Sequence, residues 1–255
     1  MIELDKMDKD LREIHEASMA ALEQTGMTFH HPKVIEIMQQ KGIRIEGQTA
    51  FFTREQVIEW VSKAPSQFKM YARNPRYDFE VGGDHVEVCP GSGSSFVCDV
   101  NGKKHAALMS DYVNFLKLYH QSNYYNVNGG IVVQPTDIGQ STIPLMLYAT
   151  MVYSDKVIIT GTGETEEVEK LMDMLGIVFG GKKALSEKPR CLTIVNTNTP
   201  LQFDTKMLET MMVFNKYKQP VIIAAAAMAG TTAPMTLAAT IALANAEVLA
   251  GIAVA

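Results

Sequence analysis

Helical and strand-like patterns of apolar residues alternate regularly between residue 110 and the end of the chain. Each helical pattern is followed by a short apolar run. The pairs are 111–121 with 130–133, 143–153 with 157–160, 165–179 with 191–195, and 205–217 with 221–225, and a last helical pattern starts at Pro234. Because parallel strands need a long crossover connection, this alternation predicts a parallel sheet covered by helices.

The first 80 residues have a different pattern, which predicts short helices. Helical periodicity over Leu11–Leu22 stops at Gly26, and Pro32–Lys41 is a second candidate. Arg54–Ala64 is a third, with Thr53 as its N-cap. Short alternating segments follow and predict hairpins: Tyr77–Val81, His85–Val88 and Phe96–Val100, with turns at Gly82-Gly83 and Asn101-Gly102. We therefore predict a helical preface over 1–80 and a main domain over 81–255.

The loops after the predicted strands decide between two parallel architectures. They are long and polar after every strand, whereas a doubly wound sheet concentrates its ligand contacts at one switch point. This favours an α/β fold of the (β/α)8 TIM-barrel type. Only about five strands are found where a barrel needs eight, so we expect only the N-terminal part of the barrel, truncated before closure. An open five-stranded sheet remains the alternative.

The candidate ligand-binding side chains after the strands are neutral amides and hydroxyls. Such groups orient a ligand by hydrogen bonds without supplying an acid, a base or a nucleophile. As turn-forming residues, they are equally well explained by loop structure alone. The candidates are Gln134, Asn196, Asn198, Thr231 and Thr232.

Motifs for other chemistries are weak. The six histidines show no HxH or HExxH spacing, so no metal site is predicted. The Gly161-Thr-Gly163 segment after a strand is similar to a dinucleotide or S-adenosylmethionine loop. Glu164 and Glu166 place negative charge at the following helix start, which disfavours a phosphate. An S-adenosylmethionine-dependent methyltransferase remains an alternative.

Composition and charge exclude several classes of partner. The formal net charge of −5 comes without a block of Lys or Arg, which argues against nucleic acid and against an anionic membrane surface. No apolar signal segment starts the chain, and the apolar stretch Pro220–Ala229 is too short to span a bilayer. Three cysteines without a CxxC pair fit a reducing compartment. We expect a soluble, cytoplasmic protein.

The segment from Ala227 to Gly251 resembles the signature stretch of the trimethylamine:corrinoid methyltransferase family. Its most specific parts are the loop Gly-Thr-Thr-Ala-Pro, 230–234, and the helical stretch Asn-Ala-Glu-Val-Leu-Ala-Gly, 245–251. The earlier Cys89-Pro-Gly-Ser-Gly segment and the helix at Asp111 also resemble this family. The similarity covers most of the chain.

The resemblance implies a (β/α)8 enzyme that passes a methyl group from a methylated amine to the Co(I) corrinoid (cobalamin) of a separate partner protein, with no cofactor bound covalently. Glycine betaine or a similar quaternary amine is the implied substrate, in one-carbon metabolism or methanogenesis. The catalytic position, which is pyrrolysine in the archaeal enzymes, is expected beyond Ala255. A homo-oligomer is expected for the full-length protein, and an inactive fragment acting only as a binding module is the remaining alternative.

An aromatic face is the expected partner of a quaternary ammonium group. The candidates are Phe96, Tyr124, Tyr125 and Tyr148. We favour Phe96 as a substrate-binding residue because a polar, glycine-rich loop precedes it.

Overall fold

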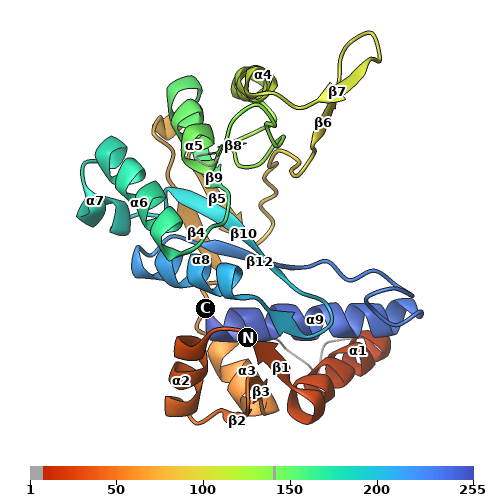
Figure 1. Cartoon of the computed structure of the whole chain (residues 1–255). Coiled ribbons are helices and arrows are strands. Elements are labelled where there is room, and N and C mark those ends of the chain that lie inside the picture. Colours follow the sequence, from red (N-terminus) through yellow and green to blue (C-terminus); the bar gives the residue numbers. More distant parts are fainter. Residues whose placement is uncertain (1–7, 140–141) are drawn as a thin grey trace. The chain divides into compact units, whose positions relative to one another are not determined.

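The computed structural model describes residues 8–139 and 142–255 (Figure 1). Contacts along this part of the chain separate two units, each built from stretches that are distant in sequence. Unit 1 contains the chain up to Pro65, Ile194–Met212 and Ile222–Ala255, and unit 2 contains Ser66–Thr193 and Val213–Val221. Three elements have residues in both units: β10 (Cys191–Thr197), α8 (Thr205–Lys216) and β12 (Val221–Ala225).

A parallel sheet is the main strand assembly, in the order β12-β10-β9-β8. In unit 2, β9 (Val157–Thr160) pairs in parallel with β8 (Val127–Gly129) and with the beginning of β10. In unit 1, the rest of β10 lies next to β12 (Val221–Ala225). The predicted mixed α/β class with a parallel sheet is therefore confirmed, and closure into a barrel stays a prediction.

Helices connect the strands of this sheet, as the sequence pattern predicts. They are α4 (Met109–Gln121) before β8, α5 (Thr142–Tyr153) before β9, α6 (Thr165–Phe179) and α7 (Lys182–Ser186) before β10, α8 before β12, and α9 (Leu237–Val254) after it. The predicted strand at 130–133 is wrong, because β8 already ends at Gly129. Gly129 and Gly130 both have positive φ, 100° and 70°, which ends the extended backbone there.

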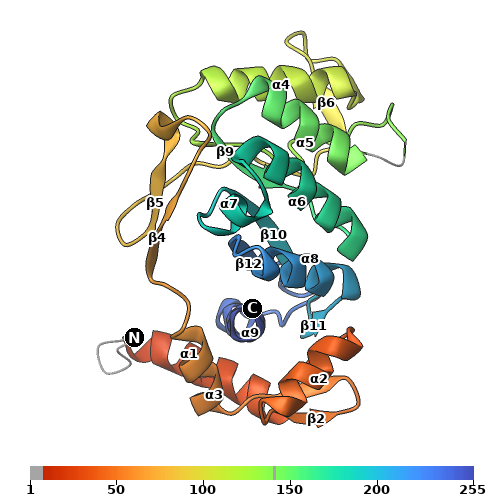
Figure 2. The ribbon, with the colours of Figure 1, turned by 90° about the vertical axis from the view of Figure 1, so that its left-hand side faces the viewer.

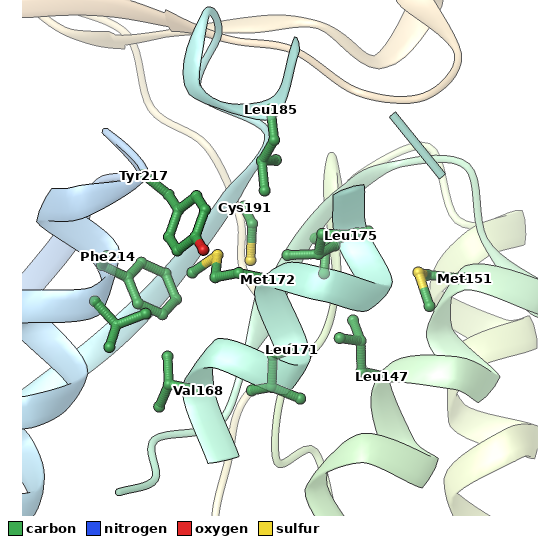
Figure 3. Close-up of a cluster of buried hydrophobic side chains, with 12 residues drawn as sticks. Leu147, Met151, Val168, Leu171, Met172, Leu175, Leu185, Cys191, Phe214 and Tyr217 are labelled. Carbon is green, nitrogen blue, oxygen red and sulfur yellow. The ribbon is translucent and has the colours of Figure 1, made fainter. Parts of the chain in front are cut away.

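The core of unit 2 is built around one face of α6. Val168, Leu171 and Leu175 repeat at helical spacing and are each at most 1% exposed. Figure 3 shows this face between Phe214 on one side and Leu147 on the other. Each such fully buried side chain contributes roughly 1.5 to 3 kcal/mol to folding.

Gln219 connects the polar edges of this core. Its side chain is buried and its Oε1 accepts hydrogen bonds from the amides of Arg190 and Cys191, at 2.8 and 3.1 Å. Its Nε2 donates to the carbonyl oxygens of Leu185 and Tyr217, both at 2.9 Å. One amide side chain thus holds together α7, the end of α8 and the start of β10.

Two antiparallel hairpins complete unit 2. β6 (Phe96–Cys98) pairs with β7 (Lys104–Ala106) across the predicted Asn101-Gly102 turn. β5 (Phe79–Gly82) pairs with β4 (Gln67–Met70). The sequence pattern did not predict β4. The predicted strand His85–Val88 is wrong: of its residues only Val88 forms a bridge, with Tyr125. The prediction failed because β5 takes its partner from the preceding segment of the chain.

Unit 1 contains the N-terminal helices. α1 (Lys9–Ala20) continues into a π-helical turn before Gly26, and α2 (Pro32–Gln40) starts at the predicted proline. α3 (Arg54–Val61) is capped by Thr53, whose side chain and that of Gln56 form a reciprocal capping box. The predicted helices of the preface are therefore confirmed, apart from small differences at their ends.

A small sheet that the sequence did not predict joins the N-terminal segment to residues near 200. Its strand order is β11-β1-β3-β2. The strands are β1 (Met27–Phe29), β2 (Arg44–Glu46), β3 (Thr49–Phe51) and β11 (Gln202–Phe203). Phe203 stacks on Phe29 with ring centroids 6.0 Å apart, and Phe52 meets Phe29 edge-on at 6.1 Å. This aromatic cluster is the centre of the unit 1 core.

α9 packs against α1 and α3 in unit 1 (Figure 2). Ser18 of α1 donates to the Ala242 carbonyl oxygen and accepts from Asn245 Nδ2, both at 2.9 Å. α9 is long and apolar enough to cross a membrane by length and composition, a test that buried core helices also pass.

Replacing Gln219 with alanine should lower the free energy of unfolding by about 2 to 4 kcal/mol, because two amides and several carbonyl groups lose their buried partner. Equilibrium urea denaturation measures this change. The control is Gln40→Ala, an exposed helix position whose effect should stay within about 0.5 kcal/mol. Equal stability of the two variants would contradict the assigned role of Gln219.

The stability of unit 1 should depend on the protonation of His15. Burial of this ring, together with the Arg54 guanidinium, lowers the pKa of His15 below 6.5. Between the folded and unfolded pKa values of His15, the unfolded chain binds more protons than the folded chain. The stabilisation that comes from the neutral ring is therefore fully present above pH 6.5 and is lost as the pH falls through the folded pKa.

His15→Leu should therefore lose less stability than the wild-type protein when the pH is lowered from 8 to 5. Thermal denaturation across this pH range tests the prediction. The control is Gln40→Leu at an exposed position without a titrating side chain, which should keep the wild-type pH dependence. Identical pH profiles for wild type and His15→Leu would argue against it.

Candidate functional site

The ends of β10 and β12 lie at the same edge of the sheet. The hydroxyl of Thr197, the last residue of β10, is 3.5 Å from the carbonyl oxygen of Ala224, the second-last residue of β12. In parallel α/β sheets, ligands bind at this edge, beyond the carboxyl ends of the strands. The loops after β10 and β12 are therefore the candidate site of unit 1.

Side chains at the end of β10 alternate between two faces. Thr197 and Thr199 point toward α9, where both hydroxyls donate to Glu247. Asn196 and Asn198 are exposed and, by the two-residue period of extended backbone, share the opposite face. Reciprocal backbone hydrogen bonds between Asn198 and Gln202, at 2.8 and 3.1 Å, close the loop. The predicted residues Asn196 and Asn198 are thus brought side by side.

Thr231 and Thr232 lie in a tight turn after β12. The Met228 carbonyl oxygen accepts from both of their amides, at 3.1 Å each. The Thr232 hydroxyl accepts from the Met228 amide, also at 3.1 Å, whereas Thr231 is exposed. The Thr232 hydroxyl therefore stabilises its own turn, and Thr231 is the residue of this pair that faces solvent.

Gln134 and Phe96 belong to unit 2. The Gln134 amide donates to the Ser94 carbonyl oxygen at 2.8 Å, and the Gln134 side chain accepts from Ser95 at 3.3 Å. The structure thus brings Gln134 next to the residues that precede Phe96. The Phe96 ring is 53% exposed, and Lys104 Nζ lies 4.4 Å from its centroid. Phe96 therefore already contacts a cation of its own hairpin.

The other aromatic candidates differ from one another in their surroundings. Tyr125 packs edge-on against Tyr119, with centroids 4.6 Å apart. Tyr124 and Tyr148 are 82% and 58% exposed, Tyr148 on the surface of α5. The choice of Phe96 among these aromatic residues therefore stays a prediction from the sequence.

The Gly161-Thr-Gly163 loop is filled by side chains of its own unit. A Cβ at Gly161 would lie 2.8 Å from Ile143, and one at Gly163 would lie 2.6 Å from the Glu167 carboxylate. The adjoining hollow, lined in part by Gly130 and Thr160, has room for about one water molecule. These contacts argue against an S-adenosylmethionine loop at this position.

The part of the chain that the structure describes holds no cluster of metal ligands, and of its three free cysteines only Cys98 is exposed. In that part of the chain, no group of three or more His, Cys, Asp or Glu side chains could hold a metal ion. Burial raises the pKa of the Cys89 thiol to about 11 and that of Cys191 to about 12. Both thiols are therefore protonated at neutral pH, which makes them poor nucleophiles.

A sequence profile described as trimethylamine methyltransferase (MTTB) matches residues 3–255. The chain belongs to the trimethylamine methyltransferase family. It is 36% identical over 249 residues to the glycine betaine methyltransferase of Desulfitobacterium hafniense strain Y51. The aligned region covers 97% of the chain and 52% of that relative.

Two further relatives carry other amines in their names. The trimethylamine methyltransferase MttB of Desulfitobacterium hafniense strain DCB-2 is 25% identical, over 96% of the chain and 50% of that protein. The L-carnitine:corrinoid methyltransferase of Eubacterium limosum is 24% identical, over 89% of the chain and 48% of that protein. The chain thus spans about half the length of the curated relatives it matches.

The segment by which the sequence resembles this family serves to pack α9. Asn245 contacts Ser18 of α1, and Glu247 binds the loop after β10. At Gly251 a Cβ would lie 2.6 Å from Ile223 and 3.1 Å from Phe203. The partners of these three residues are distant in sequence. Their structural role was therefore not predicted from the sequence. The signal for Glu247 was its position as the one charged residue between Leu237 and Val254.

Gly251→Ala should lower the free energy of unfolding by about 1 to 3 kcal/mol, because the added methyl overpacks the contact of α9 with Ile223 and Phe203. Denaturant titration of the purified protein measures the change. Gly91→Ala is the control: it has open space and should change stability by no more than about 0.5 kcal/mol. A neutral Gly251→Ala would show that α9 is not closely packed at this position.

Proposed function

We propose that this chain is part of a corrinoid-dependent methyltransferase, which moves a methyl group from a quaternary amine to the Co(I) corrinoid of a partner protein. Glycine betaine is the first candidate substrate. The observation that carries the proposal is the 36% identity to a glycine betaine methyltransferase across 97% of the chain. The relative named for L-carnitine, also a quaternary amine, supports the same substrate class.

The chemistry suits the side chains that the strand ends provide. When the methyl–nitrogen bond of a quaternary ammonium breaks, the electron pair stays on nitrogen and a neutral tertiary amine leaves. The leaving group therefore needs no proton, and the Co(I) corrinoid supplies the nucleophile. What the protein must do is place the methyl carbon in line with the acceptor. Neutral amides and hydroxyls, such as those after β10 and β12, are sufficient for this task.

We assign binding of the substrate carboxylate to the amides of Asn196 and Asn198. Glycine betaine and L-carnitine carry a carboxylate, and two neighbouring amide groups can donate hydrogen bonds to it. The exposed Thr231 hydroxyl at the same sheet edge is a third donor, and Thr232 supports the turn. Phe96 for the ammonium group and Gln134 for orientation stay predictions from the sequence.

The assembly proposed around this chain follows the family resemblance. We propose a (β/α)8 barrel that is completed by further strands, with 1–80 as the preface and 81–255 as the first part of the barrel. The corrinoid is carried by the partner protein and is not bound covalently to this chain. The full-length protein is proposed to be a cytoplasmic homo-oligomer.

Full-length enzyme, mixed with its corrinoid protein in the Co(I) state, should convert Co(I) to methyl-Co(III) when glycine betaine is added. The absorption spectrum of the corrinoid reports this conversion, and trimethylamine and L-carnitine are tested in parallel. Asn198→Asp should raise the KM for glycine betaine by about tenfold or more, because two carboxylates repel each other. The KM for an amine without a carboxylate should change little.

Asn123→Asp, at an exposed position of unit 2, is the matched control and should leave all constants unchanged. Absence of a spectral change with every methylated amine would sink the proposed function and support the alternative of a binding module. An unchanged KM in Asn198→Asp, with active enzyme, would instead remove Asn198 from the carboxylate site.

A further inference from the structure

Glu247 is a fully buried carboxylate that binds a single loop. The side chain has no exposed surface, and its Oε2 accepts from the hydroxyls of Thr197 and Thr199 at 2.5 and 2.8 Å. Its Oε1 accepts from the Leu201 amide at 2.8 Å. All three donors lie within five consecutive residues after the core of β10. A carboxylate is retained in a protein interior only when hydrogen bonds replace its water in this way.

Glu247 contacts this loop at every second residue, through the side-chain hydroxyls of Thr197 and Thr199 and the backbone amide of Leu201. Leu201 has φ 52°, a left-handed conformation that a leucine adopts only where its surroundings hold it. Its amide is one of the three groups that Glu247 binds. The carboxylate therefore holds both ends of the segment, the strand terminus at Thr197 and the strained residue at Leu201.

This clamp determines the orientation of the residues between its contacts. Because Thr197 and Thr199 are turned toward α9, the intervening Asn198 and the preceding Asn196 are turned to the opposite, exposed face. Loss of the carboxylate would free Thr197 and Thr199 to rotate, and the two asparagines would lose their common direction.

We propose that Glu247 is a positioning residue of the amine site: by binding Thr197, Thr199 and Leu201, it holds the amides of Asn196 and Asn198 in the arrangement that receives the substrate carboxylate. This inference rests on the proposed function, since it assumes that the two asparagines contact substrate. Glu247 itself lies on the other side of the strand and does not contact the substrate.

The chemistry of the three donors predicts which replacements are tolerated. The Leu201 amide can only donate, whereas a threonine hydroxyl can donate or accept. A glutamine can therefore direct its carbonyl oxygen to Leu201 and its amide nitrogen to the rotated hydroxyls. An alanine leaves all three groups without a partner. Glu247→Gln should accordingly preserve the loop, and Glu247→Ala should release it.

Hydrogen exchange and steady-state kinetics on the full-length enzyme test the proposal together. In Glu247→Ala, amide exchange over residues 198–203 should accelerate by about tenfold or more, since the loop loses its anchor. The KM for glycine betaine should rise by a similar factor, about tenfold, with a smaller loss of kcat. Glu247→Gln should stay within about threefold of wild type in both measurements.

Two matched variants control for general destabilisation. Glu166→Ala removes an exposed glutamate of α6 in unit 2 and should alter neither measurement. If Glu247→Ala does not fold, Thr199→Val deletes one clamp contact with little change of shape, and Thr199→Ser restores the hydroxyl. The valine variant should show faster loop exchange and a higher KM, and the serine variant should reverse both.

The possible outcomes separate this inference from the proposed function. An active wild-type enzyme whose Glu247→Ala or Thr199→Val variant exchanges faster but keeps its KM would overturn the positioning role. Unchanged exchange would overturn the clamp itself. A wild-type protein inactive with every methylated amine refutes the proposed function, and loop exchange in the variants then still decides whether Glu247 holds the segment.

Discussion

The need to satisfy a buried carboxylate is the constraint on which the arrangement of unit 1 depends. Glu247 has no access to water, so its oxygens must take hydrogen bonds from the chain. Those bonds come from the loop after β10, which continues into β11 and so into the small sheet with β1. The same helix, α9, packs on α1 through Ser18. Glu247 thus connects the last helix to the end of β10, and Ala242 and Asn245 of the same helix connect it to α1.

The segment Ala227–Gly251, by which the sequence resembles the family, has a structural role. Its asparagine, glutamate and glycine contact α1, the β10 loop and the β11–β12 region, respectively. A motif of this kind acts on a site indirectly, by fixing the backbone that carries the ligand-facing residues. The polar residues that face solvent, Asn196 and Asn198, lie outside the segment, on the strand that Glu247 holds.

The elements that were predicted correctly from the sequence are those whose apolar pattern extends over one continuous segment of the chain. The strands at 157–160 and 221–225 and the helix at 165–179 were predicted with their observed bounds. The two strands are short continuous apolar runs, and buried residues repeat along the helix at helical spacing. β8 was displaced because Gly129 and Gly130 end it early. The β1–β3 sheet was missed because its strands are three residues long and β1 pairs with β11, which is distant in sequence. No local pattern can indicate such a pairing.

The candidate site shows the same division between local and distant information. That Asn196 and Asn198 share a face follows from the two-residue period of a strand, which is local. That the opposite face is held by Glu247 depends on a contact about fifty residues away, and only the charge of this residue among apolar neighbours signals it. The orientations of the two faces are nevertheless coupled. An extended segment cannot turn Thr197 and Thr199 inward without turning the asparagines outward, so the interaction that stabilises unit 1 also presents the amides of the proposed site.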